Sequence, residues 1–104
     1  MSGRNISFIL FALAIISGCV VAPLPTEEYT LARAALAAAK DSGAERLAPG
    51  IWYKADENYH FGEKYLKEKD NISAKAAFLK SIEFAEKAEN AARIKKFESG
   101  ENFQ

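Results

Sequence analysis

Few side chains in this sequence have the type and spacing needed for catalysis. His60 is the only histidine, and Asp56 and Glu57 precede it by four and three residues, which would make them its neighbours on a helix. A metal site needs several converging ligands, and this trio would hold a metal ion only weakly. The serine and threonine hydroxyls lack an oriented base. We therefore predict a half-exposed histidine on a polar face, with no metal, no cofactor and no enzymatic activity.

Cys19 is the one residue whose surroundings predict a specific modification. It is the only cysteine, so an internal disulfide is excluded. A short polar start with Arg4 precedes an almost continuous apolar run over residues 6–16. A run of this length is typical of a signal-peptide core, whereas a membrane-spanning helix needs about 20 apolar residues. The sequence therefore predicts that the N-terminus is a targeting segment.

The four residues at the end of this segment resemble the lipobox of bacterial lipoprotein precursors, in which an aliphatic residue and two small residues precede a cysteine. They are Ile16, Ser17, Gly18 and Cys19. The resemblance implies recognition by a signal peptidase, removal of residues 1–18, and covalent diacylglycerol and N-acyl lipid on the Cys19 thiol. The alternative is a hydrophobic N-terminal helix with an incidental cysteine.

The residue after the cysteine bears on which membrane holds the anchor. In the sorting rule of enteric bacteria, aspartate at this position retains a lipoprotein at the inner membrane. Val20 stands here instead. By this resemblance we expect the outer membrane of the cell envelope, with the protein facing the periplasm.

Helical periodicity and helix-end residues predict an all-α fold for the remaining chain, with three helices. Residues 19–25 form a lipidated, proline-rich tether, and residues 26–97 form the helical domain. The first helix opens at Thr26-Glu27-Glu28, with the threonine as its cap, and Gly43 follows its end. Residues 98–104 are expected to be a flexible tail.

The second helix is expected from near Pro49 to about Lys69, and the third from Ile72 to about Phe97 after an Asp70-Asn71 cap. Each has one face of small and aromatic residues at helical spacing. These faces comprise Trp52, Ala55, Tyr59, Gly62 and Leu66 on the second helix, and Ala74, Phe78, Ser81, Ala85, Ala88 and Ala92 on the third.

This pair of helices resembles one tetratricopeptide unit over residues 55–88. Gly62 and Tyr65 stand where the first helix of that repeat has glycine and tyrosine. Ala74, Phe78 and Ser81 stand where the second helix has alanine, an aromatic residue and a small residue. The resemblance implies an antiparallel hairpin whose helices touch at the small residues.

The mature chain also resembles the domain of unknown function 4398 family of small helical envelope lipoproteins. The features shared are an Ala-rich helix over residues 32–39, the Ala48-Pro49 step, and alanines at helical spacing over residues 74–92. The resemblance covers residues 26–96. It brings no known catalytic residues.

The aromatic residues of the second helix are the best candidates for a partner-binding patch. Trp52, Tyr53, Tyr59 and Phe61 form the densest aromatic cluster, and aromatic side chains dominate binding hot spots. The alternative is that a domain this small needs them all in its core. Because Trp52 and Tyr53 are adjacent, they point about 100° apart on a helix, so one of them is expected to stay partly exposed.

Charge and anchoring together favour a binding module. Fourteen basic residues balance fourteen acidic ones and form no basic stripe, so nucleic acid is not an expected partner. We expect a lipid-anchored protein that attaches to the membrane and binds an envelope protein as an assembly module. The alternative is a structural link between membrane and peptidoglycan.

Overall fold

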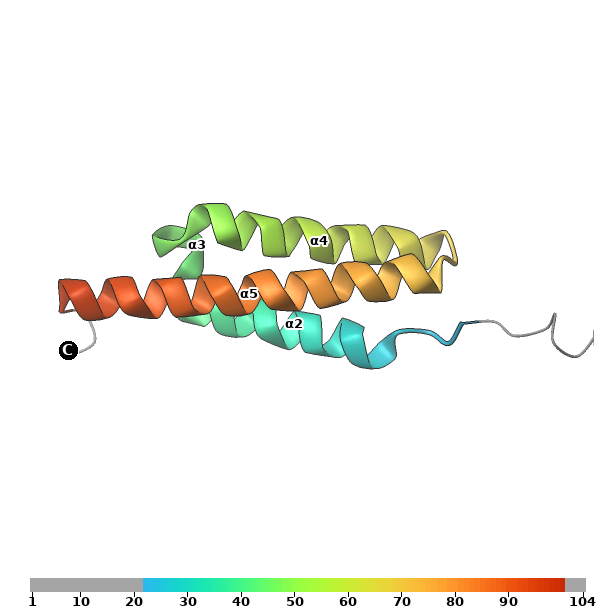
Figure 1. Ribbon diagram of the computed structural model, residues 1–104, viewed down its shortest axis with the longest axis horizontal. Helices are drawn as coiled ribbons and strands as arrows, with labels where there is room; N and C mark the ends of the chain where they lie inside the picture. Colours follow the sequence, from blue (N-terminus) through green and yellow to red (C-terminus); the bar gives the residue numbers. More distant parts are fainter. Residues whose placement is uncertain (1–21, 101–104) are drawn as a thin grey trace, which may run out of the picture.

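The computed structural model describes residues 22–100, and within this range the chain forms helices and no strand. The helices are α2 (Thr26–Asp41), α3 (Ala44–Leu47), α4 (Pro49–Lys67) and α5 (Asn71–Ser99) (Figure 1). The expected all-α fold is confirmed. None of these helices is both long enough and apolar enough to cross a bilayer.

The segment expected to carry the lipid anchor lies outside the described residues. It comprises the signal peptide over residues 1–18, with its recognition residues Ile16, Ser17 and Gly18, and the lipidation residue Cys19. These interpretations stay predictions.

Helix α5 is the central element of the bundle. It packs against α4 on one side and against α2 on the other, whereas α2 and α4 have little contact with each other. In Figure 1, α4 and α5 form an antiparallel hairpin, and α2 runs in the same direction as α5. The expected antiparallel hairpin of the last two long helices is therefore present, with α2 added to the side of α5.

The connection from α2 to α4 contains a short helix that the sequence analysis missed. Gly43 has a φ of 85° just past the end of α2, as expected for a glycine that terminates a helix. Helix α3 follows with only four residues, too few to show a periodicity. The Lys95 side chain of α5 donates a hydrogen bond to the carbonyl of Leu47 at the end of α3. The connection is thereby attached to the central helix.

Proline and aspartate define where the last two helices begin. Pro49 is the first residue of α4, where its missing N–H has no partner to lose. The Asp70 carboxylate accepts a hydrogen bond of 3.1 Å from the backbone N–H of Ser73. Hydrogen bonds with the side chain and the backbone of Ser73 lower the pKa of Asp70 below its ordinary value of 3.8. Thr26 does not cap α2 as predicted. It is the first helical residue, Pro25 holds the cap position, and no side chain caps this end.

Two helix ends differ from the predicted bounds. Helix α4 stops at Lys67 and not at Lys69, whose φ of 60° marks a tight turn into α5. Helix α5 continues to Ser99, and Gly100 closes it with a φ of 80°. The expected tail over 98–104 was therefore placed slightly too early.

Alanine methyl groups make up most of the core, and Phe78 is its only large, fully buried side chain within residues 22–100. The predicted inner faces of α4 and α5 are confirmed, because their small residues are the buried ones. One group of buried residues comprises Ala39, Ala44, Ala55, Ala85, Ala88 and Ala92, and a second comprises Ala32, Ala74 and Phe78. Each methyl group removes little apolar area from water, so stability depends on how closely the helices approach.

The closest approach of α4 and α5 occurs at Gly62. A Cβ atom on this residue would lie 2.4 Å from Cε1 of Phe78 and 2.6 Å from Cδ1, so the ring occupies the space that any side chain would need. Three residues after Phe78, the buried Ser81 hydroxyl donates a hydrogen bond of 2.7 Å to the carbonyl of Ala55. These two contacts fix the spacing of the hairpin.

Replacing Gly62 tests this packing. Gly62→Ala should lower the free energy of unfolding by about 1–3 kcal/mol, because the methyl group must displace the Phe78 ring. Gly50→Ala is the matched control, since nothing lies within 4 Å of its Cβ position. Alanine should stabilise the helix there by up to about 1 kcal/mol. Urea unfolding followed by circular dichroism measures both, and equal effects would contradict the close approach.

The cap at Asp70 should make stability depend on pH. Because folding lowers the pKa of this carboxyl, its contribution is present above the ordinary value of 3.8 and is lost as pH falls through the lower, folded-state pKa. Asp70→Ala should reduce the Tm by a few degrees at neutral pH, and the difference from wild type should shrink in strong acid. Glu86→Ala, which removes an exposed carboxylate of the same helix, should not lower the Tm. A pH-independent difference at position 70 would contradict this account.

Candidate functional site

The structure divides the predicted aromatic patch between the inside and the outside of the bundle. Trp52 and Tyr59 are half-buried against the two groups of core residues, as a structural role requires. Tyr53 and Phe61 face outward, with 70% and 43% of their surface exposed. The four residues therefore do not form one patch, and only the outer pair remains available to a partner.

Tyr59 belongs to an aromatic cluster that joins all three long helices. Its ring stacks on Tyr29 of α2 at 5.9 Å between centroids and lies 5.8 Å from Phe78 of α5. Burial raises the pKa of the Tyr59 hydroxyl well above its ordinary value, and a hydrogen bond with Tyr29 and the negative charge of Glu63 raise it further. The hydroxyl therefore stays protonated, and the cluster holds the helices together.

Other partly exposed rings are covered by cationic side chains of the bundle itself. Lys54 and Lys87 both lie over the ring of Phe84, at 5.6 Å from its centroid, and Arg33 lies over Tyr29 at 5.7 Å. Tyr53 and Phe61 are not among the rings covered in this way by Lys54, Lys87 or Arg33. Their faces are thus left to solvent or to another molecule.

Tyr53 and Phe61 flank an open hollow on the outer face of α4. The hollow has a volume of about 420 Å³, and its charged lining residues are Asp56, Glu57 and Lys64, with His60 between them. All of its residues come from one helix, at spacings of three and four, so α4 alone determines their positions. An exposed apolar surface within a ring of charged groups has the character of a protein-binding site.

His60 lies at the centre of this face without forming a metal site. Its Nε2 lies 3.5 Å from a carboxylate oxygen of Asp56, and its Nδ1 lies 3.1 Å from one of Glu63. Glu57, expected as the third member of a weak metal trio, makes no such contact with the ring. Within residues 22–100, no three histidine, cysteine or acidic side chains are placed to hold a metal ion. The arrangement orients the imidazole, but 64% of its side chain is exposed.

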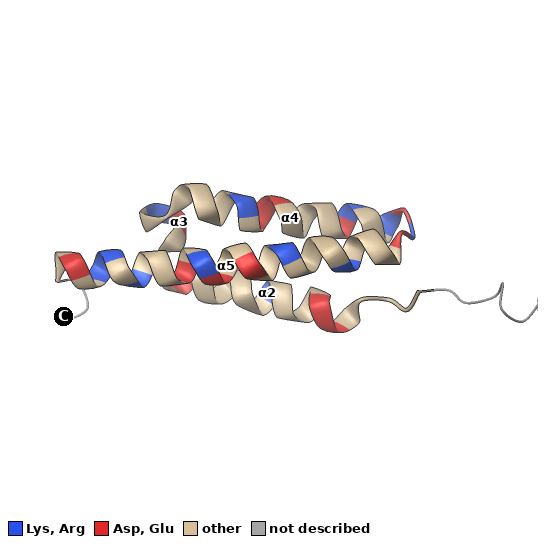
Figure 2. Cartoon of the chain, viewed as in Figure 1, with Lys and Arg blue, Asp and Glu red and all other residues tan. Residues whose placement is uncertain are grey.

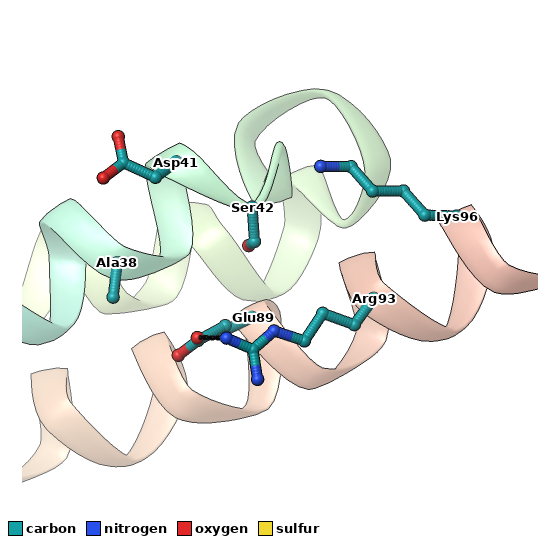
Figure 3. A pocket seen from close by; sticks show the side chains of 6 residues that line it. All are labelled: Ala38, Asp41, Ser42, Glu89, Arg93 and Lys96. Carbon is teal, nitrogen blue, oxygen red and sulfur yellow. Dashed lines mark ion pairs between the residues drawn. The ribbon is translucent and has the colours of Figure 1, made fainter. Parts of the chain in front are cut away.

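A second hollow, of about 410 Å³, lies where the end of α2 meets α5. Two of its charged groups, Glu89 and Arg93, pair with each other, as Figure 3 shows. Arg93 forms an ion pair of 2.5 Å with Glu89, and Lys96 extends toward the α2–α3 connection, where its Cε lies 3.4 Å from the Cβ position of Gly43. Asp41 points away from these groups. The hollow therefore presents no set of converging side chains for an anion or a nucleophile.

Basic and acidic residues alternate along the described helices. Figure 2 shows no stripe of a single sign on α4 or α5. Several opposite charges pair within a helix, such as Lys87 with Glu83 at 3.0 Å.

The fold and this surface define a small α-helical bundle with an exposed aromatic face on α4. Comparison of the chain with family models, curated proteins and solved structures finds no match. The resemblances to the tetratricopeptide unit and to the domain of unknown function 4398 family therefore stay predictions.

Part of the candidate site was not identified from the sequence. Lys64 is absent from the predicted patch, although it follows His60 by four residues and Phe61 by three, a spacing that places all three on one face of a helix. The separation of Tyr53 from Trp52 did follow from helix geometry. The pairing of His60 with Glu63 depends on side-chain rotamers, which spacing alone does not determine.

Alanine substitutions should separate the inner from the outer aromatic residues. Trp52→Ala and Tyr59→Ala should each lower the free energy of unfolding by about 2–3 kcal/mol, since both leave a gap in a small core. Tyr53→Ala and Phe61→Ala should change it by less than about 0.5 kcal/mol. Urea titrations of the four variants provide the comparison, and comparable losses in all four would show that the whole cluster is core.

Proposed function

We propose that this protein is a lipid-anchored, non-enzymatic helical module at the periplasmic face of the outer membrane, where it binds an envelope protein through the outer face of α4. The observation that carries the binding part is the exposure of Tyr53 and Phe61 beside a hollow lined by charged groups. The observation that carries the anchoring part is the sequence Ile16-Ser17-Gly18-Cys19 after a short apolar run.

The chemistry of the α4 face supports binding over catalysis. Tyr53 and Phe61 supply rigid apolar area that loses little conformational entropy on binding. The surrounding charges, from Asp56, Glu57 and Lys64, can form the polar rim of an interface and select a partner by charge. The described residues include no nucleophile held by an oriented base, so the surface has the means to bind and lacks the means to react.

The rigidity of the helix supports the same function. All the residues of this face project from α4, which is held on its opposite side by the Gly62–Phe78 contact and by the Tyr59 cluster. A partner would therefore meet a preformed surface, and little ordering free energy would be spent on binding. A covalent lipid on Cys19 would keep this surface at the membrane, where it could serve in the assembly of a larger complex.

Site-specific photocrosslinking in cells tests this function. A benzoylphenylalanine residue at Tyr53 or Phe61 should give a discrete crosslink to one envelope protein. The same group at Leu31 or Leu79 is the matched control, since these exposed apolar residues lie on α2 and α5. The crosslink should disappear with Cys19→Ala, because the unanchored protein is no longer concentrated at the membrane.

Three outcomes would contradict the proposal. Equal crosslinks from all four positions would indicate non-specific contacts. Crosslinks only to peptidoglycan fragments would favour the membrane–wall link. A crosslink that persists unchanged with Cys19→Ala would show that the anchor has no part in binding.

A further inference from the structure

The chain that leads to Cys19 enters the bundle at one defined end. Asn71, the first residue of α5, donates a partly buried hydrogen bond of 2.9 Å from its Nδ2 to the carbonyl of Ala22. The expected tether over residues 19–25 is therefore not free chain in its described part. In Figure 1 it meets the bundle at the end where α4 turns into α5.

Packing of the next residues fixes the direction of this segment. Pro25 is buried, and Leu24 and Pro25 line a small hollow together with Tyr29 of α2 and Leu66 of α4. The backbone N–H of Tyr29 also bonds to the Pro25 carbonyl at 2.9 Å. The segment is held by contacts on both sides, so it has little freedom to pivot between Ala22 and α2.

Very little chain separates this attachment from the lipidated residue. Only Val20 and Val21 lie between Cys19 and Ala22, and three fully extended residues reach at most about 11 Å. The acyl chains of an anchored Cys19 lie within the bilayer. The α4–α5 end of the bundle must then lie within this short distance of the lipid headgroups.

The side chains at this end suit contact with lipid. Ile72, in the first turn of α5, is 72% exposed, and Leu24 is 69% exposed. Lys67 and Lys69 stand exposed around the turn, where their long side chains can reach phosphate groups while the apolar residues contact the interface. The exposed carboxylates of Glu68 and Asp70 lie in the same turn and balance the charge of the two lysines, so the apolar side chains carry the contact.

We infer that the long axis of the bundle is perpendicular to the phospholipid surface, an end-on orientation. The α4–α5 turn then contacts the lipid, with Leu24 and Ile72 at the interface. This inference rests on the lipid anchor of the proposed function. Helix α5, with 29 residues, then extends about 43 Å away from the membrane. Helix α3 and the end of α5 become the distal end, and the Tyr53–Phe61 face points sideways into the periplasm.

Fluorescence quenching by nitroxide-headgroup lipids tests this orientation. Lipidation blocks the only native thiol, so the lipidated protein can carry one fluorophore on an added cysteine, Glu68→Cys at the turn or Glu98→Cys near the end of α5. Both proteins are reconstituted in vesicles of phosphatidylethanolamine and phosphatidylglycerol. We expect several-fold stronger quenching at position 68 than at 98. Equal quenching would mean that the bundle lies flat, and no quenching at either position would mean that it stands clear of the lipid. Both results overturn the inference.

A second pair of variants tests the apolar contact. Ile72→Glu should reduce quenching at position 68 several-fold, because a carboxylate disfavours entry into the interface. Leu79→Glu, at a half-exposed position farther along the same helix, should leave quenching unchanged. Circular dichroism checks that both variants fold, and equal responses would overturn the assigned contact.

Palmitate incorporation separates the failure of this inference from failure of the proposed function. If the protein incorporates palmitate at Cys19 but position 68 is not quenched more strongly than position 98, only the end-on orientation is overturned. If the protein incorporates no palmitate, both the lipid anchor and the end-on orientation are overturned.

Discussion

The rest of the structure depends on the close approach of α4 to α5. Because Gly62 has no side chain, the Phe78 ring lies directly against the α4 backbone. That separation lets Ala55 and Ala85 meet within one group of core residues, and it brings the Ser81 hydroxyl to the Ala55 carbonyl. A core of methyl groups gains its stability from many short-range contacts, and each contact weakens rapidly if the helices separate. A small, alanine-rich domain can therefore hold a defined shape.

The central position of α5 follows from its sequence, since it presents small residues toward both neighbours. Ala85 and Ala88 pack in the same group as Ala39 of α2 and Ala55 of α4. Because α4 is held by its inner side, the residues on its outer side are not constrained by packing against α5. Tyr53 and Phe61 occupy that outer side, where 70% and 43% of their surface stays exposed. The same helix thus serves packing on one face, and we propose that it serves recognition on the other.

Much of the fold followed from periodicity and from residues at helix ends. Local sequence predicted the inner faces of α4 and α5, the start of α4 at Pro49 and the cap of α5 at Asp70. It suffices for these features because each is determined by residues that are neighbours along the chain. The rest needed long-range contacts. Helix α3 is attached through Lys95 from the far end of the chain, and the hydrogen bond from Asn71 to Ala22 joins residues 49 positions apart. The same limit applies to the candidate site, where spacing placed Trp52 and Tyr59 on the inner face of α4 but could not show that His60 lies beside Glu63 as well as Asp56.

The anchor is the claim on which the function of this surface depends, and the intact mass of the protein purified from membranes tests it most directly. We predict a chain that begins at Cys19 and carries the added mass of a diacylglyceryl group and an N-linked acyl chain. A chain that retains residues 1–18, or one that begins at Cys19 with an unmodified thiol, would contradict it.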